Sequence, residues 1–278
     1  MWGRCRVATS IEGENVLKLG VGFMFALLCT PSVAWAGAWT LPQGTGQWIA
    51  TLTGTTATSY FSDNGLASTP RYSKQELDLL IEYGITDRLT GIFNPGLQNI
   101  DIASPTNAER FGLNYTEFGA RYGFFESADW VVSGQTTLRI PGTFETSNPA
   151  AIGYTDVEAD FRALLGHNFK AGDMPAFFDF ELAERWRTDG YPSEFRFEGT
   201  VGVKVFPRWM LLLQSFNVIS EGAGISIFGG SYAYYKVELS AVYTLTDKWW
   251  LQVGAVSTYA GTNSLQENGV ILGVWHQF

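Results

Sequence analysis

Charged residues and usable cysteines are scarce in this chain of 278 residues. Only 16 % of its residues are charged, whereas ordinary soluble domains contain about 25 %. Cys5 and Cys29 are the two cysteines, and both belong to a leader that we expect to be removed. The remaining chain would then have no thiol for a disulfide or for thiolate chemistry. The formal net charge of -9 provides no basic patch for nucleic-acid phosphates, so we expect no nucleic-acid partner.

The first 36 residues have the pattern of a cleavable secretory signal peptide. Basic residues precede an apolar run at 19–29, and Ala34-Trp35-Ala36 supplies the small residues expected before a cleavage site. A membrane anchor is the first alternative, but the run is shorter than the roughly 20 residues that a spanning helix needs. Lipoprotein processing at Cys29 is the second, and Leu28 before it is an unsuitable context. We therefore predict a signal peptide at 1–36 and one domain at 37–278.

The domain has no run of 18 apolar residues, and its polarity instead alternates with a period of two. The segment KQELDLLIEYGI, which begins at Lys74, places leucine, isoleucine and tyrosine mostly on one face and carboxylates on the other. The segments beginning at Asp156 and Glu194 behave in the same way. A soluble sandwich also alternates, but these segments are about as long as a tilted membrane-spanning strand of 9 to 11 residues. The fold class predicted is all-β, a transmembrane antiparallel β-barrel of about 12 strands.

Tight turns alternate with longer polar loops, which is the asymmetry expected of an outer-membrane barrel. The tight turns are predicted near 86–88, 127–129, 170–175, 207–208 and 246–248. The longer loops are predicted near 61–71, 99–111, 141–155, 187–193, 220–230 and 260–268. The strands between them are predicted at 46–60, 73–85, 89–98, 112–125, 130–140, 156–169, 176–187, 194–206, 209–219, 231–245, 249–259 and 269–278. Ten or fourteen strands are the alternative counts, and an even count places both ends of the domain on the periplasmic side.

Aromatic residues gather near the tight turns, where they would form a girdle at the membrane interface. We assign nine residues to this girdle: Trp48, Tyr83, Phe124, Phe125, Trp130, Trp209, Tyr243, Trp249 and Trp250.

The chain ends with the segment GVILGVWHQF. Its alternating apolar positions and final Phe278 resemble the terminal strand of bacterial outer-membrane proteins. That resemblance implies that Phe278 acts as an assembly signal for the barrel-assembly machinery. His276 stands where an aromatic residue is usual, third from the end. The localisation implied is the bacterial outer membrane of a Gram-negative cell, where membrane lipid and lipopolysaccharide would surround the barrel.

A second resemblance covers most of the domain. Its residues are Gly37-Ala38-Trp39-Thr40-Leu41-Pro42 followed by Gly44 and Gly46, together with the string at 82–90, EYGITDRLT. These strings resemble outer-membrane proteins related to the phenol-degradation (meta-pathway) family. The resemblance implies a transport protein and leaves the solute open.

If the apolar faces contact lipid, the charged faces line a lumen, because a charge on the lipid side costs a few kcal/mol. Two interpretations remain open: a hydrated pore that passes small polar or cationic solutes, or a filled interior of cross-strand ion pairs. The second would make the protein a structural or accessory barrel for surface attachment or polymer export. The predicted lumen-lining residues are Glu76, Asp78, Glu117, Arg121, Arg139, Glu158, Asp160, Arg162, Asp179, Glu181, Arg185, Arg196, Glu198, Lys236 and Glu238.

The candidates for catalysis are few. His167 and His276 are the two histidines, and both fall on the face predicted to meet lipid, so a Ser-His-acid site or a zinc site lacks its usual imidazole. Asp179 and Glu181 share a face at a spacing that a glycosidase could use, but lumen lining predicts the same spacing. The glycine-rich segment that begins at Glu221 fits no phosphate-binding pattern. We therefore expect no enzyme, no metal and no cofactor, and a channel for passive passage of small solutes.

Overall fold

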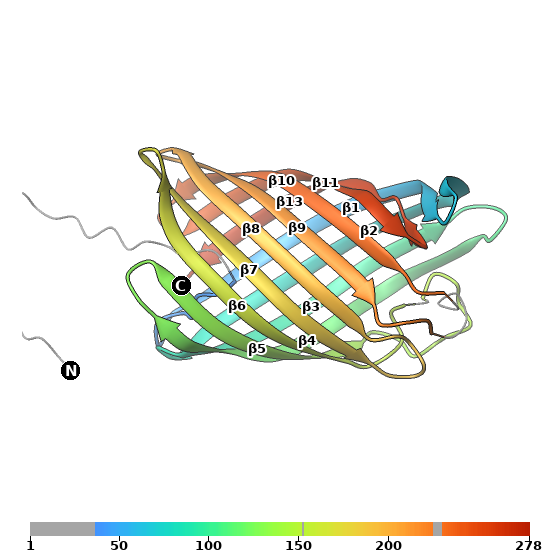
Figure 1. Cartoon of the computed structure of the whole chain (residues 1–278), viewed down its shortest axis with the longest axis horizontal. Helices are drawn as coiled ribbons and strands as arrows, with labels where there is room; N and C mark the ends of the chain where they lie inside the picture. Colours follow the sequence, from blue (N-terminus) through green and yellow to red (C-terminus); the bar gives the residue numbers. More distant parts are fainter. Residues whose placement is uncertain (1–36, 152, 225–229) are drawn as a thin grey trace, which may run out of the picture. The chain divides into compact units, whose positions relative to one another are not determined.

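The computed structural model describes residues 37–151, 153–224 and 230–278. The predicted signal peptide at 1–36 and part of the glycine-rich segment lie outside these residues. The regular elements of the described chain are all strands, and they form one closed antiparallel barrel (Figure 1). The described residues include no helix that could span a membrane.

Twelve long strands and one two-residue strand make the barrel. Each long strand pairs with its neighbours in sequence, and β13 pairs with both β11 and β1, which closes the sheet. The prediction of a twelve-stranded antiparallel barrel is therefore confirmed. The strands are β1 (Gly46–Ser62), β2 (Gly65–Thr86), β3 (Leu89–Ile102), β4 (Ala108–Glu126), β5 (Trp130–Pro141), β6 (Glu158–Ala171), β7 (Met174–Arg187), β8 (Glu194–Phe206), β9 (Trp209–Ser220), β10 (Ala233–Thr246), β11 (Trp249–Thr262), β12 (Ser264–Leu265) and β13 (Asn268–Gln277).

The five predicted tight turns lie together at one end of the barrel, where each joins two consecutive strands. The described part of the chain also enters and ends there, at Gly37 and Phe278 (Figure 1). Short turns mark the periplasmic end of outer-membrane barrels. We therefore call this end periplasmic and the opposite end, with the longer loops, extracellular.

Three predicted loops were wrong, because the strands continue through them. The region 61–71 is a hairpin in which β1 runs to Ser62 and β2 begins at Gly65. A left-handed φ of 99° at Gly65 suits this tight connection. The regions 99–111 and 260–268 are also largely strand. Strand ends beyond the membrane need no apolar face, so their polar composition resembles a loop while their backbone pairing continues.

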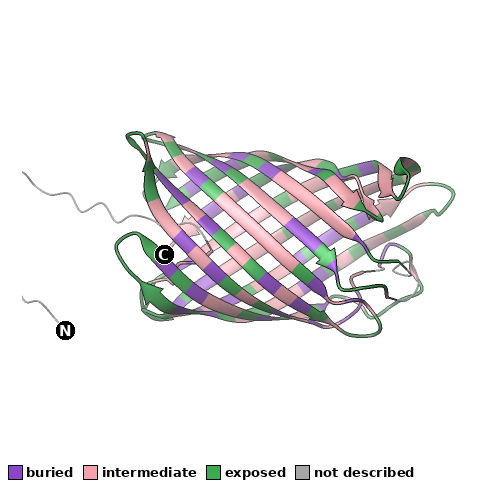
Figure 2. Ribbon diagram, viewed as in Figure 1, coloured by how far each residue is buried: buried purple, intermediate pink, exposed green. Residues whose placement is uncertain are grey.

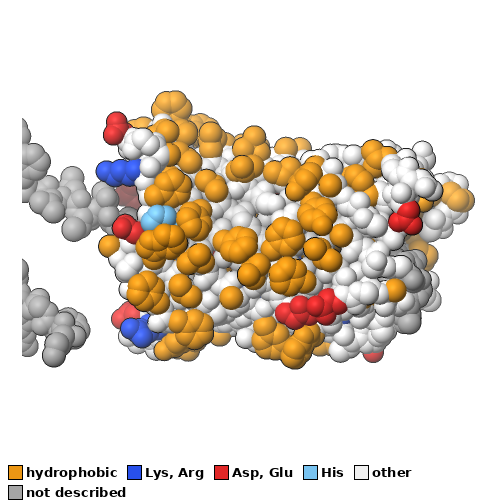
Figure 3. All heavy atoms as spheres, in the orientation of Figure 1, with side chains coloured by type: hydrophobic (Ala, Val, Ile, Leu, Met, Phe, Trp, Pro, Cys, Tyr) orange, Lys and Arg blue, Asp and Glu red, His pale blue; other side chains and the backbone are white. Residues whose placement is uncertain are grey.

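The outer surface of the barrel is apolar along most of its length. Leu213, Leu239 and Val253 are 52 %, 60 % and 54 % exposed although they lie in the middle of paired strands. Burial alternates along the strands (Figure 2), and hydrophobic side chains are spread over the left and middle of the face seen in Figure 3, with few at its right end. Such a surface would be unfavourable in water, so it defines a belt that contacts lipid.

Aromatic side chains ring the periplasmic end, mostly as predicted. Trp249 stacks on His276 at 4.2 Å between ring centroids, and Trp130 stacks on His167 at 3.9 Å. The assignment of Trp250 to this girdle was wrong, because Trp250 is 6 % exposed and packs inside the barrel. Successive residues of a strand point to opposite faces, so the outward Trp249 requires an inward Trp250.

Candidate functional site: the barrel interior

A ladder of opposite charges crosses the inner wall of neighbouring strands. Arg139 of β5 pairs with Glu117 of β4 at 2.7 Å and also with Glu158 of β6. Glu158 in turn accepts from Arg187 of β7 at 3.0 Å. These residues are adjacent in the strand register, where opposite charges stabilise the pairing. The ladder therefore holds the register of β4 to β7 and neutralises most of their charge.

Arg162 is a cation of this wall that contacts three carboxylates. Glu181 of β7 and Glu198 of β8 are direct partners in the register, and two carboxylates at such positions repel each other. Arg162 on β6 reaches both, with its Nη1 at 2.6 Å from Glu181 and 2.9 Å from Glu198. Its Nε also donates to Asp160 at 2.7 Å. One guanidinium therefore compensates an unfavourable acid pair on two other strands.

The extracellular half of the barrel contains an outer hollow of about 890 Å³. Acids and bases are balanced on its walls, since seven Asp or Glu residues face seven Lys or Arg residues. The acids are Glu76, Asp78, Glu117, Glu158, Glu194, Glu198 and Glu267, and the bases are Lys74, Arg139, Arg162, Arg185, Arg187, Arg196 and Lys236. This hollow is thus strongly polar but carries little net charge.

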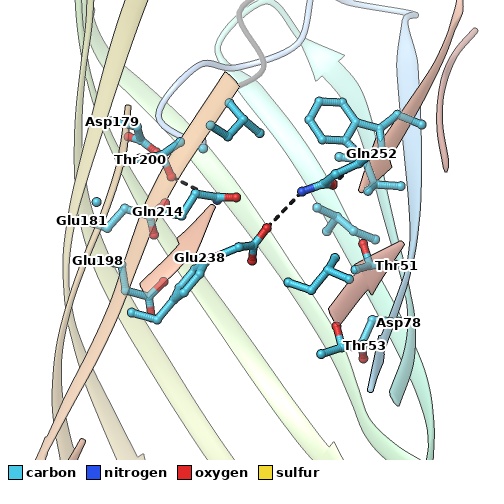
Figure 4. A pocket seen from close by; sticks show the side chains of 18 of the residues that line it. Thr51, Thr53, Asp78, Asp179, Glu181, Glu198, Thr200, Gln214, Glu238 and Gln252 are labelled. Carbon is cyan, nitrogen blue, oxygen red and sulfur yellow. Dashed lines mark hydrogen bonds between the residues drawn. The ribbon is translucent and has the colours of Figure 1, made fainter. Parts of the chain in front are cut away.

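A second space, which we call the inner chamber, lies toward the periplasmic end and has a volume of about 430 Å³. Among the described residues, its lining contains no Lys or Arg and five acids: Asp78, Asp179, Glu181, Glu198 and Glu238. Glu181 and Glu198 are paired with Arg162, whereas Asp78, Asp179 and Glu238 form no ion pair with the described residues. Figure 4 shows Asp78 on one side of the chamber and Asp179, Glu181 and Glu198 on the opposite side.

The outer hollow and the inner chamber adjoin. Asp78, Asn94, Glu198 and Phe216 line both of them. Neutral polar side chains, including Gln252, which donates to Glu238 at 3.0 Å (Figure 4), and apolar ones such as Ile49 and Leu80 complete the chamber. The interior therefore holds two adjoining spaces, and the one nearer the periplasm has the more acidic lining.

An inner apolar cluster, made of Phe177, Leu212, Val242, Trp250 and Trp275, bounds the chamber at its periplasmic end. Trp275 donates from Nε1 to Gln252 at 3.0 Å, so its polar edge faces the polar space. The members come from β7, β9, β10, β11 and β13. Alternation could have revealed two of them, because Phe177 shares its face with Asp179 and Val242 shares its face with Glu238.

The N-terminal segment, residues 37–45, folds into the periplasmic mouth. Ala38 is fully buried, and its carbonyl accepts from Ser133 at 2.7 Å. The carbonyl of Trp39 accepts from Arg121 at 3.0 Å, and the Trp39 ring meets Phe177 edge-on. This segment and the inner apolar cluster together narrow the barrel where the turns lie.

The sequence reasoning missed this segment, although glycines in the strands mark its path. A Cβ at Gly84 would lie 2.2 Å from the carbonyl oxygen of Pro42, and a Cβ at Gly166 would lie 2.5 Å from the Trp39 ring. A strand glycine commonly marks the close approach of another backbone or group. Neither glycine has a left-handed φ, so close approach is the reason for glycine at these positions.

All fifteen predicted lumen-lining residues have buried or half-buried side chains on the inner wall. Arg121 pairs with Glu82 at 2.7 Å, and Asp160 pairs with Arg185 at 3.0 Å. The other thirteen line the outer hollow or the inner chamber. Their contact with a solute stays a prediction. Gly37 lies against both Asp179 and Glu181, so the chain itself occupies the space that a glycoside would need there. The described residues contain no cluster of His, Cys, Asp and Glu suited to a metal ion.

Glu267 closes the charged interior at its extracellular end, in the connector between β12 and β13. It pairs with Lys236 at 2.5 Å and with Lys74 at 4.0 Å. Burial alone would raise the pKa of this carboxyl, but the two ammonium groups outweigh burial and lower the pKa to about 2.

The lipid-facing belt, the closed strand order and the polar interior define an outer-membrane β-barrel, located in the bacterial outer membrane. No known protein family matches the sequence of the chain, so the resemblance to the phenol-degradation family is not confirmed. No curated protein matches its sequence either. Among solved structures, an outer-membrane channel from Pseudomonas putida F1 is similar, with a TM-score of 0.71 and 17 % identity over 88 % of this chain and 100 % of that one.

Two further solved structures share the fold. The NanC porin has a TM-score of 0.54 and 11 % identity over 82 % of this chain and 98 % of its own. The translocator domain of the autotransporter NalP from Neisseria meningitidis has a TM-score of 0.50 and 10 % identity over 84 % of this chain and 88 % of its own. At these identities the likeness concerns the architecture of the barrel.

Proposed function

We propose that the protein is an outer-membrane channel for passive passage of small solutes, with a preference for polar or cationic ones. The observation that carries this proposal is the pair of adjoining spaces inside the barrel, a charge-balanced outer hollow next to an inner chamber lined by acids. Rings of acidic side chains select cations in other channels. The fold shared with a channel of P. putida and with the NanC porin supports the same role.

The unpaired acids set the selectivity in this proposal. The ion-pair ladder leaves little net charge on β4 to β8, so the field along the pore comes mainly from Asp78 and Glu238.

Planar-bilayer recording of the purified protein tests the proposal. We expect discrete conductance steps and, in a gradient of potassium chloride, a reversal potential on the cation-selective side. The double substitution Asp78→Asn, Glu238→Gln should move the reversal potential toward zero. Asp63→Asn at the exposed extracellular hairpin is the matched control and should leave it in place. Unchanged selectivity in a folded double variant would contradict the assignment of these acids.

A barrel with a closed lumen is the second candidate, and the inner apolar cluster favours it. Phe177, Leu212 and Trp275 bound the chamber where a solute would leave for the periplasm. A folded protein that gives no conductance steps would support this candidate, in which the barrel serves surface attachment or polymer export. Trp39→Ala removes a large ring from the periplasmic mouth. If this variant gave conductance steps where the parent gave none, the protein would be a pore that the N-terminal segment restricts.

A further inference from the structure

Gly37 lies at the bottom of an acidic pocket inside the barrel. A Cβ built on it would lie 2.5 Å from Oε1 of Glu181 and 2.9 Å from Oδ2 of Asp179. Its backbone N–H donates a hydrogen bond to the Asp179 carboxylate. The nitrogen of this residue therefore contacts Asp179, and Glu181 lies close beside it.

The same pocket lacks a cation. Asp179 is 4 % exposed, its Oδ1 has no hydrogen-bond partner, and it forms no ion pair with the described residues. Glu181 has one cationic partner, Arg162, which it shares with Asp160 and Glu198. Buried carboxylates are normally paired, so a positive charge between Asp179 and Glu181 would complete the site.

Cleavage after Ala36, which the sequence predicts, would create that charge at this position. Water hydrolyses the Ala36–Gly37 peptide bond, Ala36 leaves with the new carboxylate, and Gly37 keeps the amino group, which takes up a proton. We propose that the resulting α-ammonium of Gly37 is the cation of Asp179 and Glu181. Removal of the signal peptide thereby completes the barrel interior and fixes the N-terminal segment in the periplasmic mouth.

The chemistry of the two nitrogens explains why processing matters. The amide of an uncleaved chain is neutral and donates one hydrogen bond, whereas an ammonium carries a full charge and donates three. One amide proton cannot satisfy both carboxylates, but an ammonium can. The carbonyls of Ala38 and Trp39 are held by Ser133 and Arg121, so the next two residues position the terminal nitrogen without help from its charge.

Competitive acetylation of the processed, folded protein tests the proposal. Mass spectrometry of the N-terminal peptide gives both the first residue and its rate of labelling by acetic anhydride. Only the uncharged amine reacts, and a change of one pKa unit alters its amount about tenfold. We expect Gly37 to be the first residue and to react about tenfold or more slowly in the folded protein than in the same chain unfolded.

Three variants separate pairing from simple burial. Asp179→Asn, and Glu181→Gln as a second probe, should each speed the labelling of Gly37 in the folded barrel. Asp78→Asn removes another acid of the same chamber and should leave the rate unchanged. Insertion of one alanine between Ala36 and Gly37 moves the ammonium by about 3.8 Å and should also restore fast labelling. Folding of each variant is checked by the heat-dependent shift of its band in gel electrophoresis.

Two results would overturn the proposal. The first is a mature chain that begins at another residue. The second is a Gly37 amine that reacts as fast in the folded protein as in the unfolded one, or whose rate is the same in both acid variants as in the parent. Neither readout depends on conductance, so the channel proposal and this one fail separately.

Discussion

Replacement of Arg162 by methionine should destabilise the barrel strongly. The substitution keeps most of the alkyl stem and removes a guanidinium that contacts carboxylates of Asp160, Glu181 and Glu198 at 2.6 to 2.9 Å. Removal of one partner of a buried ion pair typically costs about 3–5 kcal/mol. Asp160 keeps Arg185 and Glu198 keeps Arg196, so the lower end, about 3 kcal/mol, is expected here.

Urea unfolding of the protein in lipid vesicles, followed by tryptophan fluorescence, measures this loss. Arg71→Met is the matched control, because Arg71 pairs with Asp101 on the surface, where the two side chains are 62 % and 48 % exposed. An exposed pair contributes about 0–1 kcal/mol. Adding Glu181→Gln to Arg162→Met should recover part of the loss, since it removes the carboxylate left without a cation. If the two arginine variants lost equal stability, the inner wall could not be a desolvated ion-pair network.

Three further outcomes follow from the structure. Leu239→Arg on the lipid face should cost about 2–4 kcal/mol of unfolding free energy in vesicles, whereas Leu66→Arg at the extracellular hairpin should cost about 0–1 kcal/mol; equal costs would disprove the position of the belt. Gly84→Ala should displace the N-terminal segment, because its Cβ would meet a backbone oxygen at 2.2 Å, and protease accessibility of that segment reports it. The stability that Glu267 contributes is full above its ordinary pKa of 4.5 and is lost as pH falls toward about 2, so the urea midpoints of the parent and Glu267→Gln should converge over that range.

The strand count and the inner wall could be predicted because a barrel strand obeys one rule over its whole length. Alternation separates Glu158, Asp160 and Arg162 from the apolar residues beside them, such as Phe161, and it does so whether or not the partner strands are known. The same rule identifies which residues share a wall. It contains no information on which acid meets which base, so the shared role of Arg162 between Glu181 and Glu198 required the register of three strands.

The errors had two physical causes. Strand ends above the membrane lose their apolar face, so the hairpin at Ser62 and Gly65 looked like part of a long loop although its backbone is paired. Position near a turn was also treated as sufficient for a place in the aromatic girdle, which put Trp250 on the wrong face. Parity along the strand decides the face, and proximity to the interface decides only the depth.

The N-terminal segment escaped prediction because nothing in residues 37–45 alternates or carries charge. Its place depends on features of other strands: glycine at positions 84 and 166, where a side chain would collide with it, and Arg121 and Ser133, which hold its carbonyls. The barrel thus devotes positions on β2, β4, β5 and β6 to a piece of chain that adds no strand. A segment that only led into β1 would not need contacts with four other strands. A segment that narrows the periplasmic mouth does need them, because they hold it in place. Any solute that crosses this barrel must pass the segment, so residues 37–45 should influence permeation as strongly as the acids of the chamber.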